Sequence, residues 1–137
     1  MRSSQVLVGI LAMLPLLGCA GIAQPTSGEL AAADYGPEIS KEAAESLAKQ
    51  VLDTHLKDPY SAVLKCDEPT QGWRNDDVFN KYKKHYGYVL ACRVNAKNSF
   101  GAYGGYKKYE FVINNGVVIS AYAEAQIQTT TYMEKIK

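Results

Sequence analysis

Apolar residues recur every three or four positions between Ser40 and Lys57. On a helix this spacing places them on one face, and the stripe consists of Ala44, Leu47, Ala48, Val51, Leu52 and Leu56. Ser40 is a favoured N-cap residue. The helix is expected to end before Pro59, because the residue before a proline avoids the α region. The pattern therefore predicts one amphipathic helix over residues 40–57.

Alternating apolar positions predict two strands after this helix. The clearer one covers residues 86–94, where one face carries Tyr86, Tyr88, Leu90, Cys92 and Val94. A shorter one covers residues 60–66, with Ala62, Leu64 and Cys66 on one face. The polar stretch between them, residues 67–85, predicts only a short helix that runs to Lys84 and is capped by Asn75, Asp76 and Asp77.

Two further runs, residues 106–114 and 117–123, predict a hairpin. Asn115-Gly116 between them is the usual two-residue turn of type I′, which needs positive φ at both positions. The turn places three pairs opposite one another: Ile113 and Val118, Phe111 and Ser120, Tyr109 and Tyr122. Residues 95–105 are expected to form a loop. The tail, residues 124–137, fits either a last strand or a frayed end.

These elements predict an α+β fold. One N-terminal amphipathic helix is expected to pack on a small, mostly antiparallel β-sheet, in a single domain over residues 38–137.

The first residues have the pattern of a secretory signal. Arg2 is followed by an apolar run from Val6 to Leu17, which is shorter than the roughly 20 residues that span a bilayer. The sequence that ends this run, Leu16-Leu17-Gly18-Cys19, resembles the lipobox of bacterial lipoproteins. The resemblance implies that residues 1–18 are removed and that Cys19 is acylated. The alternative is a plain cleaved signal peptide with an incidental cysteine.

Acylation predicts where the mature protein resides. Several acyl chains hold a protein firmly on a membrane. In lipoproteins of bacteria with two membranes, an acidic residue after the acylated cysteine favours retention in the inner membrane, and here Ala20 and Gly21 follow. The resemblance therefore implies the outer membrane, facing the periplasm. Residues 19–37 are rich in Ala, Gly, Pro, Ser and Thr, which predicts a flexible tether after the lipidated cysteine.

Removing the lipidated Cys19 from the count leaves Cys66 and Cys92, each on the apolar face of a predicted strand. An oxidising periplasm permits a disulfide between them. The other interpretation is two buried free thiols. Neither cysteine has a second cysteine or a histidine at ligand spacing, so no metal site is predicted.

The charges balance overall but are unevenly distributed. The chain has 15 basic and 14 acidic side chains, which argues against nucleic acid as a partner. Residues 29–77 hold 11 acidic and 5 basic side chains, whereas residues 78–137 hold 3 acidic and 9 basic ones. Two interpretations follow: a basic face for an anionic partner in the envelope, or an acidic helix packed beside basic strands.

Catalytic patterns are missing from the sequence. An enzyme needs a clustered nucleophile, base and charge stabiliser. The two histidines, His55 and His85, are isolated in the sequence, as packing or capping histidines usually are. The carboxylate pairs Asp67-Glu68 and Asp76-Asp77 lie in polar turns, where acidic side chains are solvated or cap a helix. The sequence therefore predicts no enzyme and no small-molecule cofactor.

Residues 95–106 form the candidate binding loop. Three glycines within five residues permit tight turns, and the side chains of Asn95, Asn98 and Ser99 are expected to hydrogen-bond the loop backbone. The aromatic residues there either cover the edge of the core or present a binding surface. The candidate binding residues are Asn95, Lys97, Asn98, Phe100, Tyr103 and Tyr106. The alternative is a rigid connection between strands.

Two segments carry a family resemblance. Residues 58–62 read DPYSA and residues 94–106 read VNAKNSFGAYGGY. They resemble a group of small bacterial and prophage lipoproteins in which a DPxSA element precedes a VNAKNSFGGYxGY loop. The likeness covers roughly residues 40–113, and this chain has Ala102 where relatives commonly have glycine. The resemblance implies a shared fold and an envelope location, and it implies no particular chemistry.

The sequence thus predicts a membrane-anchored, non-enzymatic binding module of the bacterial cell envelope, with an envelope protein as partner. Two alternatives are a phage-type exclusion factor or enzyme inhibitor, and an accessory subunit of an envelope assembly.

Overall fold

The computed structural model describes residues 24–137, so the predicted signal peptide and Cys19 lie outside the described residues. Its helices are α1 (Ser27–Ala32), α2 (Lys41–His55) and the 3₁₀ turns η1 (Pro59–Ser61) and η2 (Val78–Asn80). Its strands are β1 (Val63–Cys66), β2 (Thr70–Asn75), β3 (Lys84–Asn95), β4 (Lys107–Asn114), β5 (Val117–Ile127) and β6 (Thr130–Lys135). No helix within residues 24–137 has the length and apolar character needed to cross a membrane.

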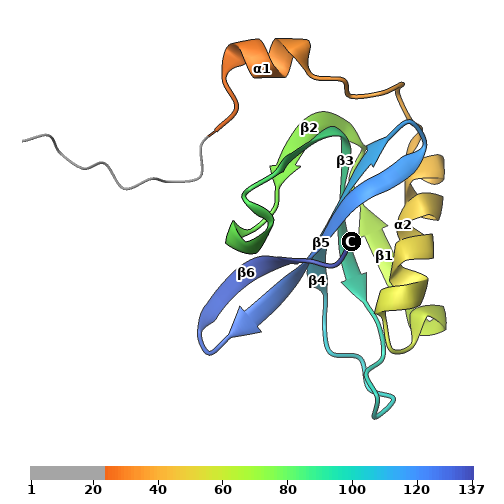
Figure 1. Ribbon diagram of the computed structural model, residues 1–137. Coiled ribbons are helices and arrows are strands. Elements are labelled where there is room, and N and C mark those ends of the chain that lie inside the picture. The colour runs from red at the N-terminus through yellow and green to blue at the C-terminus, as the bar shows by residue number, and fades with distance from the viewer. Residues whose placement is uncertain (1–23) are drawn as a thin grey trace, which may run out of the picture.

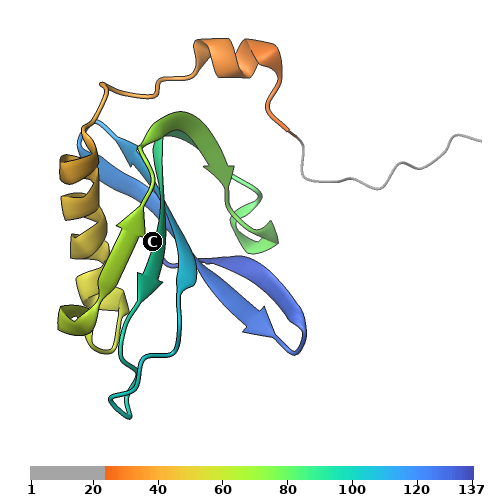
Figure 2. The ribbon, with the colours of Figure 1, turned by 180° about the vertical axis from the view of Figure 1, so that it is seen from behind.

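All six strands belong to one antiparallel sheet, with the order β1-β3-β4-β5-β6 and with β2 paired to β3 as well. The long strand β3 pairs with β2 through its first half and with β1 through its second half. α2 covers one face of this sheet (Figures 1 and 2). The predicted α+β class and antiparallel sheet are confirmed.

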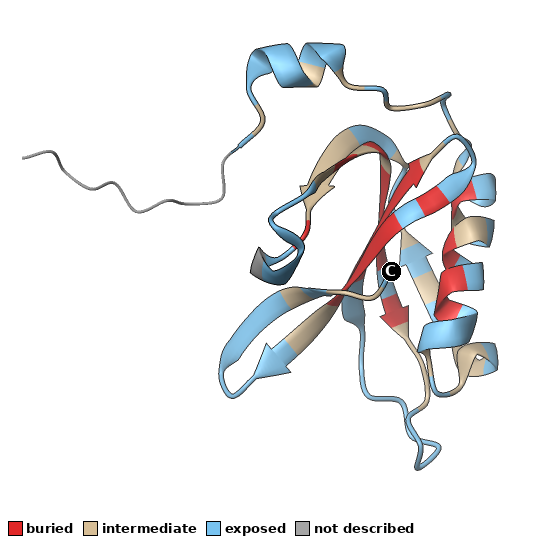
Figure 3. Cartoon of the chain, viewed as in Figure 1, coloured by how far each residue is buried: buried red, intermediate tan, exposed pale blue. Residues whose placement is uncertain are grey.

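The main core lies between α2 and the sheet (Figure 3). Four residues of the predicted helical stripe are buried, and the strands contribute the larger side chains, including Leu90, Phe111 and Ile113. Full burial of one such side chain stabilises the fold by roughly 1.5–3 kcal/mol. Ser40 is the N-cap of α2, since its Oγ accepts a hydrogen bond from the Ala43 N–H at 3.3 Å. The prediction for this helix is confirmed.

The expectation of a single helix is wrong, because α1 lies within the segment expected to be a flexible tether. Thr26 and Glu29 form a capping box: the Thr26 N–H donates to the Glu29 carboxylate at 2.7 Å, and the Glu29 N–H donates to Thr26 Oγ1 at 3.2 Å. Glu29 also pairs with Lys84 at 3.0 Å. No residue of α1 is buried, so the helix leaves no apolar period in the sequence.

The chain after α1 contacts the sheet before α2 begins. The Tyr35 ring lies edge-on to Tyr86, with centroids 6.1 Å apart. The Asn114 amide donates to the backbone oxygen of Asp34 at 2.8 Å. Residues 34–36 are therefore held against the domain.

The prediction for residues 67–85 is confirmed only in part. A short helical turn, η2, does follow Asp77, whose Oδ1 atom accepts a hydrogen bond from the Asn80 N–H at 3.0 Å, but it ends at Asn80 instead of Lys84. The strand β2 before it was not predicted. β2 pairs in register with β3, and Trp73 lies opposite Tyr86. A polar segment with no alternation gives no strand signal of its own. The hydrogen-bond ladder that β3 offers decides its conformation.

The hairpin turn is confirmed, with φ of 49° at Asn115 and 73° at Gly116. Ile113 lies opposite Val118 as predicted. The other two predicted pairs are wrong: a bulge next to Ile113 pairs Phe111 with Ala121 and Tyr109 with Ala123. The extra residue in β5 keeps Val118, Ala121 and Ala123 together in the core against α2. The tail forms β6, so its interpretation as a last strand is confirmed.

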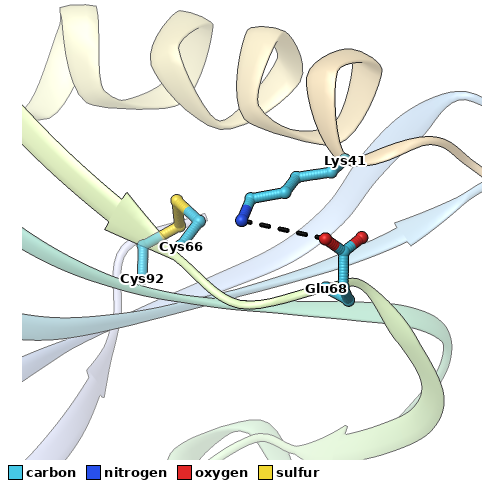
Figure 4. Close-up of a disulfide and its surroundings, with 4 residues drawn as sticks. All are labelled: Lys41, Cys66, Glu68 and Cys92. Carbon is cyan, nitrogen blue, oxygen red and sulfur yellow. Dashed lines mark ion pairs between the residues drawn. A yellow bond between two sulfur atoms is a disulfide. The ribbon is translucent and has the colours of Figure 1, made fainter.

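Cys66 and Cys92 form a disulfide, as predicted, and the alternative of two free thiols is wrong. They lie directly opposite each other on β1 and β3, with Cα atoms 4.0 Å apart. An ion pair between Lys41 and Glu68, 3.8 Å apart, lies nearby and connects the start of α2 to the segment after β1 (Figure 4).

Candidate functional site

The loop between β3 and β4 lies at the end of the domain opposite α1 (Figure 1). Its turn is built around one side chain, Asn98. The Asn98 Oδ1 atom accepts hydrogen bonds from the N–H groups of Phe100 at 2.9 Å and Ala102 at 3.2 Å. The Asn98 N–H donates to the Ala102 oxygen at 2.9 Å, and Gly101 supplies a positive φ of 78°. Asn98 therefore holds the loop backbone in one conformation.

Asn95 closes the base of the same loop. Its Oδ1 atom accepts a hydrogen bond from the Gly105 N–H at 3.1 Å, and Gly105 has a φ of 94°. Within the loop, Lys97 and Tyr103 form an isolated antiparallel bridge. The two predicted asparagines thus shape the loop, as their residue type indicates.

Ser61 attaches the loop to the rest of the domain. Its Oγ atom accepts a hydrogen bond from the Lys97 N–H at 2.8 Å, and its backbone oxygen accepts one from the Tyr103 hydroxyl at 3.1 Å. Asp58 caps the 3₁₀ turn that positions Ser61. Sequence reasoning did not assign Ser61 to this site. Its contacts with the loop join residues 36 and 42 positions apart, so no local pattern in the sequence identifies it.

The three predicted aromatic residues of the loop are exposed. The exposed fraction is 95% for Phe100, 50% for Tyr103 and 43% for Tyr106. Tyr60, next to Ser61, is fully exposed as well. None of the four belongs to the buried core between α2 and the sheet. The rings therefore lie at the surface, where they are open to contact with another molecule.

A row of basic side chains crosses the sheet beside this loop. Lys65 on β1 lies opposite Arg93 on β3, and Arg93 lies opposite Lys108 on β4. All three are exposed and alternate with residues that pack toward α2, so they lie on the other face. The Lys65 Nζ atom is 4.7 Å from the centroid of the Tyr106 ring. Like charges directly opposite each other destabilise a sheet, and the contacts of Lys65 with the Tyr106 ring and of Lys108 with Glu110 offset this.

A second polar cluster surrounds Asp76, of which only 2% is exposed. The Tyr122 hydroxyl donates to its Oδ1 atom at 2.9 Å. The Lys135 Nζ atom is 2.8 Å and the His85 Nε2 atom 3.0 Å from its Oδ2 atom. Burial raises the pKa of Asp76, but the hydrogen bonds from Lys135, His85 and Tyr122 outweigh it and hold the pKa below its usual value.

The Asp76 cluster connects distant parts of the chain. Its donors come from β3, β5 and β6, and sequence separations of up to 59 residues leave no motif. The prediction that Asp76 caps a helix is wrong, because its carboxylate is directed to these donors. With both carboxylate oxygens occupied, the cluster fastens β6 and the β2–β3 connection to the sheet.

Glu110 is the other buried carboxylate. It forms a bidentate ion pair with Arg74, in which the Arg74 Nη2 atom is 2.9 Å from Glu110 Oε1. It also forms an ion pair with Lys108, whose Nζ atom is 2.8 Å from the same Oε1 atom. Burial raises the pKa of Glu110, and the hydrogen bonds from Arg74 and Lys108 lower it further than burial raises it. This pair stabilises the face of the sheet away from α2.

The histidines and acids form no metal-binding group of three or more within residues 24–137. His55 packs edge-on against Tyr109, with centroids 6.0 Å apart. No protein-family model, no curated protein and no solved structure matches the chain.

Proposed function

We propose that this protein is a lipid-anchored, periplasm-facing binding module of the bacterial cell envelope. It binds an envelope protein through the loop between β3 and β4, and it has no enzymatic activity. One observation carries the proposal: Phe100, Tyr103 and Tyr106 are exposed on a loop whose backbone is held by Asn95, Asn98 and Ser61.

The length of the loop supports a binding role. β3 ends at Asn95 and β4 begins at Lys107, which leaves 11 residues, whereas the connection of a hairpin usually has about 2–5. Ordering a residue costs roughly 1–2 kcal/mol of backbone entropy. An ordered loop that exposes aromatic rings loses less entropy when it binds, because its conformation is already selected.

The position of the loop supports a partner in the periplasm. The predicted lipid is on Cys19, seven residues before Thr26, and a segment of that length reaches at most about 25 Å. α1 follows directly, and the loop lies at the opposite end of the domain (Figures 1 and 2). A lipid on Cys19 therefore keeps the α1 end near the membrane and directs the loop away from it.

The anchor is tested by labelling cells with radioactive palmitate and separating membranes from soluble proteins. We expect label in the wild-type protein, and we expect Cys19→Ser to lose both the label and the membrane association. If the variant fractionates like the wild type, the lipid anchor is refuted.

The binding site is tested by chemical crosslinking in intact cells followed by purification of the complexes. We expect Phe100→Ala combined with Tyr106→Ala to reduce partner recovery at least about tenfold, since exposed aromatic anchors carry much of the energy of an interface. The matched control is Ile127→Ala combined with Tyr132→Ala, which removes exposed apolar side chains from the β5–β6 hairpin. Equal recovery with the loop variant and the control variant would contradict binding by the loop.

A further inference from the structure

A hollow of about 220 Å³ lies between the base of the loop and the end of α2. Its lining includes Lys57 after α2, Lys97 and Gly104 in the loop, and Lys107 at the start of β4. These residues come from two separate segments of the chain, 55–57 and 94–109. The fold therefore assembles the hollow.

Three of the residues that line the hollow are lysines: Lys57, Lys97 and Lys107. No aspartate or glutamate is among its lining residues. Within residues 24–137, Lys57, Lys97 and Lys107 make no ion pair, although Lys97 lies 5.7 Å from the centroid of the Tyr103 ring. The partial negative charge at the C-terminal end of α2 stabilises a cation at Lys57, but it does not explain why the other two lining residues are lysines. Like charges on three lysines that line one hollow repel each other, and an anion bound there reduces that repulsion.

Gly104 leaves the backbone at the hollow open to a ligand. Its φ lies outside the left-handed region, and a methyl group added to it would meet no atom within 4 Å. Neither the backbone conformation nor the packing therefore requires glycine there. A ligand that approaches the backbone closely does favour glycine.

We propose that this hollow binds a small oxyanion, a carboxylate or phosphate group that belongs to the partner. Lysine is a common ligand for both groups, as a flexible point charge. The proposal rests on the proposed function, since it names the chemistry that the binding loop recognises at its base. The exposed rings then contact the apolar part of the same partner.

The test is a titration of the purified full-length protein, held in an uncharged detergent, with sodium phosphate and separately with sodium acetate. Backbone amide shifts are followed by NMR while sodium chloride keeps the ionic strength constant. We expect saturable shifts at residues 97–98 and 104–107, with a Kd on the order of 1 mM. Tighter binding of acetate identifies a protein carboxylate as the source, and tighter binding of phosphate identifies a phosphorylated group.

The matched variants separate a site from general screening of charge. Lys57→Gln, Lys97→Gln and Lys107→Gln together are expected to weaken binding of the preferred anion at least about tenfold. The control combines Lys49→Gln, Lys83→Gln and Lys137→Gln, three exposed lysines outside this lining, and is expected to bind like the wild type. Shifts that do not saturate, or that are equal in the two variants, overturn the proposal. The NMR shifts of the wild-type protein locate the site even if a triple variant fails to fold.

The two proposals fail in different ways. The titration uses no partner and no exposed aromatic residue. If neither anion binds but capture of the partner still requires Phe100 and Tyr106, only the anion site is refuted. If an anion binds at the hollow while the aromatic variant captures its partners normally, binding by the loop surface is refuted.

Discussion

Tyr103 donates a hydrogen bond from its hydroxyl to the backbone oxygen of Ser61, which lies 42 residues earlier in the chain, at a distance of 3.1 Å. The Ser61 hydroxyl accepts the Lys97 N–H from the other side of the same loop. The 3₁₀ turn before β1 and the loop between β3 and β4 are therefore one structural unit.

Ser61→Ala is expected to lower the free energy of unfolding by about 1 kcal/mol, because the Lys97 N–H loses its acceptor. The loop amides of residues 97–105 should then exchange faster with solvent, which hydrogen exchange followed by NMR measures. The control is Ser99→Ala, an exposed serine in the same loop. Unchanged exchange in the Ser61 variant would show that this contact does not order the loop.

Cys66→Ala combined with Cys92→Ala is expected to lower the free energy of unfolding by about 3.5 kcal/mol, since the crosslink closes a loop between residues 26 apart. Urea denaturation of the oxidised protein and the variant measures the difference. Mass analysis of a non-reduced digest should find the two cysteine peptides joined. Recovery of both cysteines as free, alkylatable thiols would be incompatible with the structure.

Asp76→Asn is expected to lower the free energy of unfolding by about 2 kcal/mol, because the charged acceptor for Lys135 and His85 is removed from a buried position. Chemical denaturation measures the loss. Glu134→Gln is the control, since it removes an exposed carboxylate beside Lys135 on the same strand. Equal losses in both variants would mean that the buried cluster contributes no more than surface charge.

The stability of the protein is expected to fall in acid. Asp76 and Glu110 have lowered pKa values in the folded protein, so both stabilise it above their ordinary pKa values of about 4. This contribution is lost as the pH falls below about 4 and through the folded pKa values. Urea denaturation at pH 2 to 7 should show the loss, and Asp76→Asn should show a smaller one. A variant with the same acid dependence as the wild type would exclude Asp76 as a source.

Local patterns in the sequence determined much of the fold. The apolar period of α2, the alternation along β3 and the positive-φ requirement at Asn115 and Gly116 each act within a few residues. The disulfide could be predicted too, because both cysteines lie on apolar faces of predicted strands. In the candidate loop, residue type alone identified Asn95 and Asn98 as backbone acceptors.

Tertiary contacts decided the rest. β2 is a strand because β3 offers it a hydrogen-bonding edge, and the bulge in β5 exists because it brings Val118 and Ala121 into the same core. The donors around Asp76 and the support of the loop by Ser61 come from segments far apart in the chain, and the hollow brings Lys57 to the β3–β4 loop. Sequence periodicity reports only which side of an element is apolar. Partners across the fold become neighbours only when the sheet has formed, so the polar clusters that distinguish this protein leave no local pattern.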